Sequence, residues 1–303
     1  MIRALREDDL GTASELLAER HARQCAAEPL LPEAPDFRAE VEALWVQGVG
    51  GAFAADGYLV ARTRDDPRWG PNVWIEAAGH AARDPELVRD LYAEAARGWV
   101  ERGLRAHYVL VPATDAGLVD AWFRLGFGAQ QAHGVVEIPE VGWPTEARLA
   151  TLDDLEQMVA LAPLLDEHSR ASPVFATPSA YSEDDLRAEI AGDLANEDYG
   201  NIVAERDGRL VGDFFVCPIE LSDAHAGLAR PPGAAILGFA VIRPDLRGTG
   251  IGLALTQACF AWARERGYRT MVTDWRVTNL SASRFWPRRG FRTTFLRLHR
   301  HVA

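Results

Sequence analysis

The sequence contains no lysine, and its 32 permanently cationic side chains are all arginines. A Walker-type phosphate-binding loop and a Schiff-base enzyme both need a lysine, so both classes are excluded. Cysteine is scarce as well, and Cys25, Cys217 and Cys259 lie far apart. Their spacing fits neither a metal-binding motif nor a disulfide framework. We therefore expect no metal and a reducing, cytoplasmic environment.

Long apolar runs are also missing from the chain. No segment reaches membrane-spanning length, and the first residues, MIRALREDDL, are too charged for a signal peptide. The formal net charge is -12, whereas nucleic-acid binding needs a basic surface. We expect neither a membrane nor a nucleic acid as partner, and the acidic balance mildly favours a cationic one.

The 303 residues are enough for two domains, and the sequence repeats itself. RALREDDL, which begins at residue 3, is matched by RLATLDDL, which begins at residue 148. ERGLR at 101–105 is matched by ERGYR at 265–269, and in both copies a tryptophan and then a GF pair follow at the same intervals. We therefore expect two copies of one domain, at residues 1–140 and 146–303, joined by a proline-containing segment.

Each copy is predicted to be a mixed α/β unit. In the second copy, apolar periodicity and turn residues predict helices and strands in alternation. The strands are expected at 146–150, 234–242, 270–275 and 291–300, with a hairpin over 201–220 that turns at Asp207-Gly208. The helices are expected within 152–168, 184–194, 251–266 and 279–286.

A glycine-rich loop, PDLRGTGIGLAL (244–255), precedes the helix at 251–266. Such a loop aims several backbone N–H groups at one point, where the helix dipole adds positive potential. Glycine lets a diphosphate approach the backbone closely. The dinucleotide fingerprint is excluded because Leu253 stands where its third glycine belongs. A plain connecting turn is the alternative.

The loop has the form R-x-x-G-x-G, with Arg247, Gly250 and Gly252, and it resembles the acetyl-CoA loop of the GNAT superfamily of N-acetyltransferases. Asn279 and the GF pair at 290–291 stand at that family's spacing, and the resemblance covers the second copy. It implies two tandem GNAT-like domains, each a mostly antiparallel twisted sheet flanked by helices. The cosubstrate would be acetyl-CoA, held in a gap between splayed strands by Phe239, Val241, Arg247, Gly248, Thr249, Gly250, Ile251, Gly252 and Asn279.

The first copy lacks this loop. Its matching segment, HAARDPELVRDL (80–91), places Asp84, Glu86 and Val88 where the glycines stand in the second copy. Carboxylates repel a diphosphate and valine blocks its approach. We expect the first copy to have lost cofactor binding and to serve as a structural part or a wall of the substrate site. Binding of a different ligand is the alternative.

Amine acetylation needs a base that removes a proton from the amine. Asp274 is the candidate, because the resemblance implies a carboxylate at this spacing from Asn279, with Glu220 as a second candidate. An ion pair between Asp274 and Arg276 is the structural alternative. The family's usual acid, a tyrosine, is replaced by Trp286, for which we favour core packing over contact with the cofactor. His225 and Asp223 are expected in a solvent-exposed loop, with a substrate-facing loop as the alternative.

The resemblance thus implies an N-acetyltransferase that moves an acetyl group from acetyl-CoA to a primary amine of a small molecule or peptide. Acidic stretches at 164–168, 182–186 and 193–200 suit a cationic amine or are simply solvated helix faces, which we favour slightly. A CoA-binding sensor or scaffold without catalysis is a second hypothesis, and an acyltransferase with another acyl-CoA, similar to tandem-GNAT mycothiol synthases, is a third. Both a monomer and a homodimer fit two fused copies.

Overall fold

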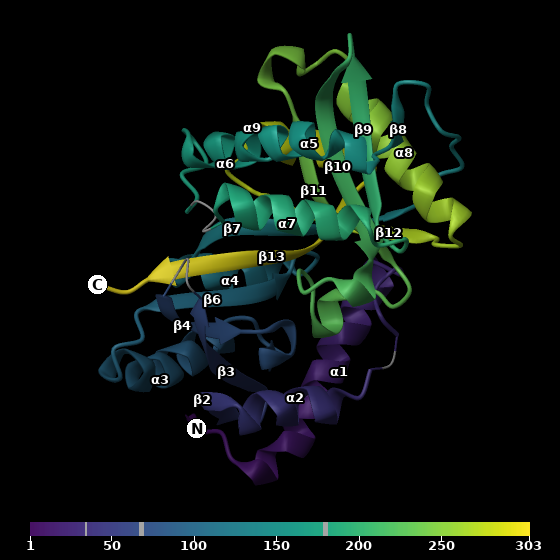
Figure 1. Ribbon diagram of the computed structural model, residues 1–303. Helices are drawn as coiled ribbons and strands as arrows, with labels where there is room; N and C mark the ends of the chain where they lie inside the picture. Colours follow the sequence, from purple (N-terminus) through teal and green to yellow (C-terminus); the bar gives the residue numbers. More distant parts are fainter. Residues whose placement is uncertain (34, 67–69, 178–180) are drawn as a thin grey trace.

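The computed structural model describes residues 1–33, 35–66, 70–177 and 181–303 (Figure 1). The helices are α1 (Leu10–Ala27), α2 (Phe37–Val46), α3 (Leu87–Glu101), α4 (Ala116–Arg124), α5 (Leu155–Leu161), α6 (Pro163–Arg170), α7 (Glu183–Leu194), α8 (Ile251–Glu265) and α9 (Leu280–Arg288). The strands of the first half are β1 (Arg3–Ala4), β2 (Gly48–Ala54), β3 (Gly57–Asp66), β4 (Gly70–Ile75), β5 (His80–Ala82), β6 (Ala106–Pro112) and β7 (Gly128–Glu137). Those of the second half are β8 (Ala147–Leu149), β9 (Gly200–Arg206), β10 (Arg209–Pro218), β11 (Ala235–Ile242), β12 (Thr270–Arg276) and β13 (Arg292–His301).

The elements predicted for the second half are confirmed. The β9–β10 hairpin turns at Asp207 and Gly208, whose φ angles are 52° and 75°. Positive φ at both central residues is the geometry of a two-residue turn that matches the twist of the flanking strands. The helix predicted within 152–168 is divided into α5 and α6, and Pro163 is the first residue of α6, where a proline is tolerated.

The described strands form one continuous sheet in the order β1-β2-β3-β4-β6-β13-β7-β12-β11-β10-β9-β8, with β5 paired to β3. Only the pairs β4–β6 and β11–β12 are parallel among these described strands. The mostly antiparallel sheet implied by the family resemblance is therefore confirmed. The sheet twists strongly across the molecule, so that β13 and β9 run in very different directions in Figure 1.

The two halves exchange their last strands. β13 lies between β6 and β7, and β7 in turn pairs with β12 of the second half. The C-terminus consequently lies beside the first half (Figure 1). The sequence gives no sign of this exchange, because β7 and β13 are equivalent strands of the two copies. The division of the chain at residues 140–146 stays a prediction about the sequence.

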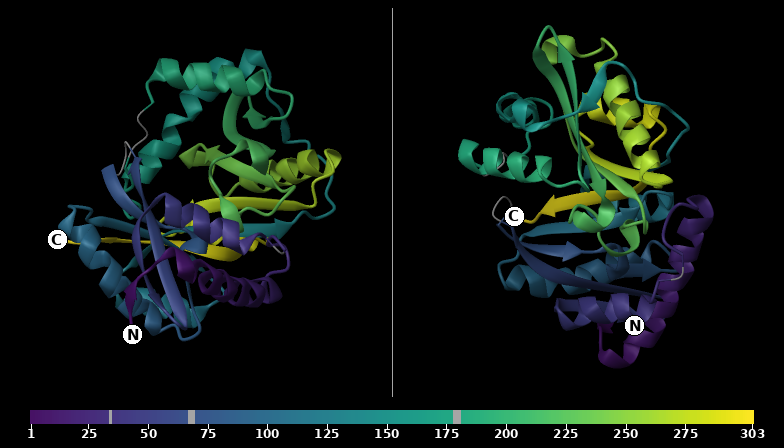
Figure 2. Two further views of the ribbon diagram at one scale, coloured as in Figure 1. Left: turned by 90° about the horizontal axis from the view of Figure 1, so that it is seen from below. Right: turned by 45° about the vertical axis from the view of Figure 1, so that its right-hand side comes forward.

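Helices cover both faces of the sheet (Figure 2). In the first half, α3 and α4 pack on one face and α1 and α2 on the other. In the second half, α8 and α9 take the place of the first pair, and α5 and α7 cover the opposite face. No helix among the described residues combines the length and the apolarity needed to cross a membrane.

The repeat in the sequence is visible as repeated hydrogen bonding. Arg3 donates to both carboxylate oxygens of Asp9, and Arg148 does the same to Asp154. Each aspartate also accepts from a backbone N–H three residues earlier, just before the first helix of its half. These matching motifs support the internal duplication.

Candidate functional site

The parallel strands β11 and β12 separate after three residue pairs. Their pairing runs from Ala235–Met271 to Leu237–Thr273 and goes no further. β11 then stays with β10 across a register shift, in which Gly238 is the extra residue between Leu237 and Phe239. Beyond Leu237 the edge of β11 that faces β12 has no strand partner among the described residues, so its backbone can pair with an extended ligand. The expected splay is confirmed.

A cavity of about 1030 Å³ opens at this point. Its walls come from both halves of the chain. The second half supplies β11, the glycine loop, β12 and α9, whereas the first half supplies Arg64, Trp74, Glu76, Leu110, Gln131 and His133. The first half is therefore a wall of the cavity, which is one of the two roles expected for it.

The glycine loop lies at one side of this cavity and ends at the first residue of α8. Gly248 and Gly250 have φ angles of 81° and 97°, which residues with a Cβ rarely adopt. A Cβ on Gly252 would lie 2.9 Å from the Ile242 side chain and 3.3 Å from the Phe285 ring. Among the described residues, the N–H groups of Gly248, Gly250, Ile251 and Gly252 have no hydrogen-bond acceptor. Four unpaired donors at a helix N-terminus make an anion-binding site.

The structure brings most of the predicted cofactor residues to the cavity. Its lining includes Phe239, Val241, Arg247, Gly248, Gly250, Gly252 and Asn279. Thr249 and Ile251 are not part of the lining. The Thr249 hydroxyl instead donates to the Leu246 carbonyl at 2.7 Å and closes the loop, and the Ile251 side chain is buried in the core.

Asn279 has a structural role that is visible directly. Its side-chain oxygen accepts from the N–H groups of Ser281 and Ala282 and so caps α9. His168, on α6, lies 3.1 Å from the same oxygen and 3.5 Å from Nη1 of Arg247. His168 therefore links the loop to α9 across the cavity, a role that no motif in the sequence indicates.

The matching segment of the first half is closed by its own side chains. Asp84 accepts a hydrogen bond from the N–H of Glu86 at 3.0 Å. Glu86 is paired with Arg89 and Arg124, and Arg83 with Glu19 and Asp56. Carboxylates thus occupy the position that corresponds to the anion site, as the sequence predicts.

Asp274 is held by residues from other segments rather than by Arg276. Gln131, from β7, donates to its Oδ1, and Nε2 of His225 lies 3.6 Å from its Oδ2. Burial raises the pKa of this carboxyl, but the close approach and charge of His225, together with His133 and Arg297, outweigh burial and lower it. Asp274 therefore carries a negative charge at the wall of the cavity.

Glu220 is not brought to this place. It lies exposed in the 3-10 turn η4 (Ile219–Leu221) and accepts from the N–H of Gly233 at 2.9 Å. It is not among the residues that line the cavity.

Trp286 is 5% exposed and packs against Phe285 and Phe291, as expected for a core residue. It also lines the cavity, so its position fits the alternative of contact with the cofactor as well.

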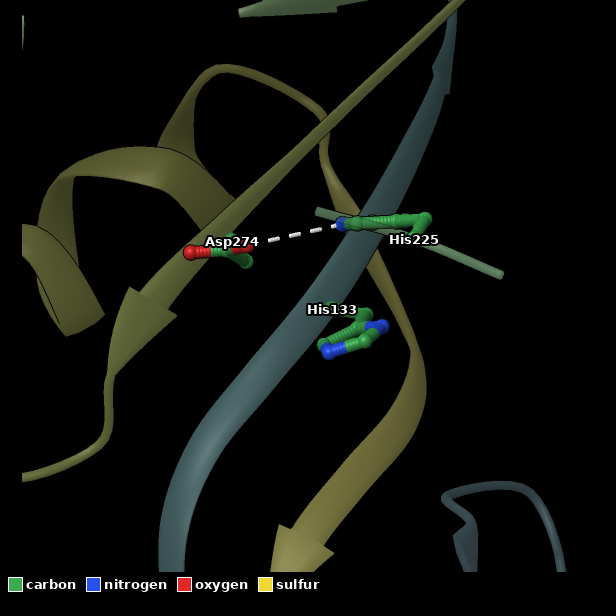
Figure 3. A group of neighbouring side chains, drawn as sticks. All are labelled: His133, His225 and Asp274. Atoms are coloured by element: carbon green, nitrogen blue, oxygen red, sulfur yellow. Dashed lines mark ion pairs between the residues drawn. The ribbon is translucent and has the colours of Figure 1, made fainter. Parts of the chain in front are cut away.

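His225 departs from the expectation of a solvent-exposed loop. Asp223 lines the cavity, but His225 is only 2% exposed, and its ring stacks on His133 with centroids 4.2 Å apart. Figure 3 shows the two rings beside Asp274. His133 is buried, and burial together with the His225 charge holds its pKa well below the usual value. The three residues offer one metal-ligating atom each, all within 4.8 Å of one another.

Comparison with known proteins matches part of the second half to a protein family. Residues 162–291 match the model of the acetyltransferase (GNAT) family, whose members use acyl-CoA, typically acetyl-CoA. A mycothiol acetyltransferase from Cellulomonas flavigena is 33% identical over 103 residues, which are 31% of this chain and 27% of the relative. The matched part thus spans about a quarter of that relative.

Solved structures match the whole chain in fold. A GCN5-related N-acetyltransferase from Sphaerobacter thermophilus superposes with a TM-score of 0.61 at 17% identity, over 99% of this chain and 95% of that one. A tandem GNAT protein from the clavulanic acid biosynthesis pathway gives a TM-score of 0.50 at 14% identity, over 100% and 98% of the two chains. Residues 162–291 therefore match the GNAT acetyltransferase family, and the chain as a whole has the tandem GNAT fold.

Proposed function

We propose that the protein transfers an acetyl group from acetyl-CoA to an amine of a small molecule or peptide. The observation that carries the proposal is the joining of two features in one cavity. The unpaired edge of β11 suits the pantetheine arm, and the unpaired N–H groups of the glycine loop suit the diphosphate. The proposed cofactor site also includes Phe239, Val241 and Arg247, which line the cavity. Asn279 contributes to it by capping α9, which fixes the position of the first residues of that helix.

The chemical step needs an amine nitrogen placed against the thioester carbon. The nitrogen attacks this carbon, a C–N bond forms, the C–S bond breaks and coenzyme A leaves as a thiolate. A β11 N–H near Val241 stabilises the oxyanion in this proposal. Asp274 attracts the cationic amine and accepts the proton that the nitrogen must lose before it attacks, and the proton left on the nitrogen after the attack passes to water. Water supplies the proton to the thiolate, because Trp286 replaces the tyrosine implied by the family resemblance.

The acceptor in this proposal carries a positive charge, because the Asp274 carboxylate lines the cavity and its pKa is lowered. Asp166 and Asp223 line the cavity as well, together with five arginines, of which Arg64 is paired with Glu76 at 2.6 Å. Of the other two acidic stretches, the one at the start of α7 is a solvated helix face in which Glu183 and Asp184 pair with Arg187. The one at 193–200 contributes no residue to the cavity lining. The match to a mycothiol acetyltransferase favours a small-molecule acceptor over a peptide.

The test is a calorimetric titration of the full chain with acetyl-CoA. Gly250→Asp introduces a carboxylate at the proposed diphosphate site, so we expect one binding site per wild-type chain and its loss in the variant. Gly103→Asp is the matched control, because Gly103 also has a positive φ but lies outside the cavity lining. No binding to the wild type would refute the proposal, and two sites would refute the loss of binding in the first half.

Turnover separates an enzyme from a CoA-binding sensor. An amine panel with detection of the released thiol should give product with cationic small amines. Asp274→Asn should retain acetyl-CoA binding and lower kcat/KM by roughly a hundredfold or more, whereas Asp223→Asn should have a smaller effect. Tight cofactor binding without thiol release from any amine would favour the sensor, and release only with another acyl-CoA would favour the third hypothesis.

A further inference from the structure

We propose that His133, His225 and Asp274 form a binding site for a divalent transition-metal ion, with Zn²⁺ as the best match (Figure 3). The three residues come from β7 of the first half, from the loop after η4 and from β12. Neither the glycine loop nor the proposed transfer reaction requires such an ion. The inference is therefore independent of the proposed function.

The first argument is that two acceptor atoms face each other. Nδ1 of His225 lies 3.3 Å from the Ala229 carbonyl oxygen. A carbonyl only accepts hydrogen bonds, so Nδ1 carries the proton and the lone pair of the neutral ring lies on Nε2. That nitrogen faces the Asp274 carboxylate. A positive charge, either a proton or a metal ion, has to lie between them.

The distance between these atoms favours the metal ion. Nε2 of His225 and Oδ2 of Asp274 are 3.6 Å apart. A charge-assisted hydrogen bond would bring them to about 2.7–2.9 Å. Two ligand atoms of a tetrahedral zinc site, each about 2.0–2.1 Å from the ion, lie about 3.4 Å apart. The observed spacing is closer to that of a coordination edge.

The second argument is the burial of imidazole nitrogens without partners. His133 and His225 are 5% and 2% exposed. Nδ1 of His133 and Nε2 of His225 are buried and have no hydrogen-bond partner among the described residues. Leaving such atoms unpaired is costly, and coordination would satisfy them. The two stacked rings lie 22° from parallel, so their in-plane lone pairs do not yet meet at one point. With ligand atoms up to 4.8 Å apart, one ring would turn and the group would contract around a bound ion.

Outer contacts orient the ligands as they do in metal sites. The Ala229 carbonyl fixes the tautomer of His225, and Gln131 donates to Oδ1 of Asp274, which leaves Oδ2 toward the histidines. Gln131 is itself fixed by a hydrogen bond from Arg297. Carbonyl and amide groups in this outer position set ring orientation and ligand basicity.

The donor set selects the metal. Two imidazoles and one carboxylate, without thiolates, suit Zn²⁺ with a fourth position for water, whereas Mg²⁺ and Ca²⁺ prefer oxygen ligands alone. His133 and Asp274 also line the cavity, so this fourth position would open toward it. Since Asp274 is the carboxylate proposed to meet the acceptor amine, bound Zn²⁺ and a cationic amine would exclude each other.

The test is a Zn²⁺ titration of the full chain after treatment with a chelator and desalting, in the absence of acetyl-CoA. We expect one Zn²⁺ per chain by calorimetry and by elemental analysis, and no binding of Mg²⁺. Replacement by Co²⁺ should give the visible absorption of a four-coordinate ion. His133→Ala, His225→Ala and the isosteric Asp274→Asn should each weaken Zn²⁺ binding at least tenfold.

His168→Ala is the matched control, because His168 lines the same cavity outside the group of three. It should bind Zn²⁺ as the wild type does. Thermal unfolding by circular dichroism identifies any variant that fails to fold, and Asp274→Asn keeps the test informative if a histidine variant does. No stoichiometric Zn²⁺ in the wild type, or equal affinity in folded variants of the three residues, would overturn the proposal. Neither result depends on acetyl-CoA binding or turnover.

Discussion

At the scale of single residues, the buried carboxyl of Asp213 lowers the stability of the folded state when it ionises. It lies on β10, is 4% exposed, and its Oδ1 has no hydrogen-bond partner among the described residues. Burial, followed by the charges of Asp193 and Asp154, raises the pKa of this carboxyl to about 7. The folded state thus holds a proton on Asp213 that the unfolded state releases near pH 4. Stability is therefore lost as the pH rises from about 4 through 7.

We predict that Asp213→Asn stabilises the protein at pH 8. The amide cannot ionise, so the cost of a buried charge disappears, and the gain should be of the order of a few kcal/mol. At pH 4 the wild type and the variant should be nearly equal. Urea denaturation at several pH values measures the difference. Asp90→Asn, at an exposed position of α3, is the control, and a variant that follows the wild type at every pH would contradict the argument.

The residues of the candidate site differ in how far the sequence reveals them. The glycine loop is local, since the positive φ angles and the helix that follows are set by neighbouring residues. Asp274 is found because it stands at a family spacing. His133 is a single histidine in an apolar strand of the half without a cofactor loop, and His225 lies in a segment with no motif. The contact between His133 and Asp274 depends on the pairing of β7 with β12, which no local sequence pattern predicts.

At the scale of elements, the starts of α4 and α9 form a natural pair. Asp115 accepts from the N–H of Leu118, and Asn279 accepts from those of Ser281 and Ala282. The same capping position thus persists in both halves, although only the second half has the glycine loop. Capping alone explains an Asp or Asn here. The proposed part of Asn279 in cofactor binding is an additional role.

We predict that Asp115→Ala and Asn279→Ala each lower the free energy of unfolding by about 1 kcal/mol, the usual cost of a lost cap. Only Asn279→Ala should also weaken acetyl-CoA binding, because α9 and the Asn279–His168–Arg247 contacts border the cavity. Urea denaturation gives the first quantity and calorimetric titration the second. Equal acetyl-CoA affinity in both variants would show that Asn279 only caps the helix and has no part in cofactor binding.

Helices and strands themselves are well predicted by the sequence, because periodicity, prolines and the Asp207-Gly208 turn act over a few residues. The arrangement of the strands is not. β7 and β13 come from equivalent positions of a duplicated sequence, so each could in principle pair within its own half or with the other. The choice depends on packing across the whole molecule, which explains why the exchange has no signature in either copy.

At the scale of the whole molecule, the exchange makes the two halves share their cores. Phe295 of β13 is fully buried among residues of α1 and α2, and Leu298 is fully buried among those of α3 and α4. Each such side chain contributes about 1.5–3 kcal/mol when buried. The loss of β13 would also leave β6 and β7 without a shared neighbour. The cavity, with walls from both halves, depends on the same junction.

We therefore predict that the halves do not fold separately. Fragment 146–303 lacks β7 and fragment 1–140 lacks β13, so each alone exposes strand edges and apolar side chains and should be unfolded or aggregated. Coexpression of the two fragments should give a soluble 1:1 complex that binds acetyl-CoA like the intact chain, because the cut falls between β7 and β8. Size-exclusion chromatography with light scattering and calorimetric titration measure both outcomes. A monomeric fragment 146–303 that unfolds cooperatively and retains acetyl-CoA binding would show instead that the second half supplies its own sheet, and that the exchange adds a wall to the cavity without being needed for the fold.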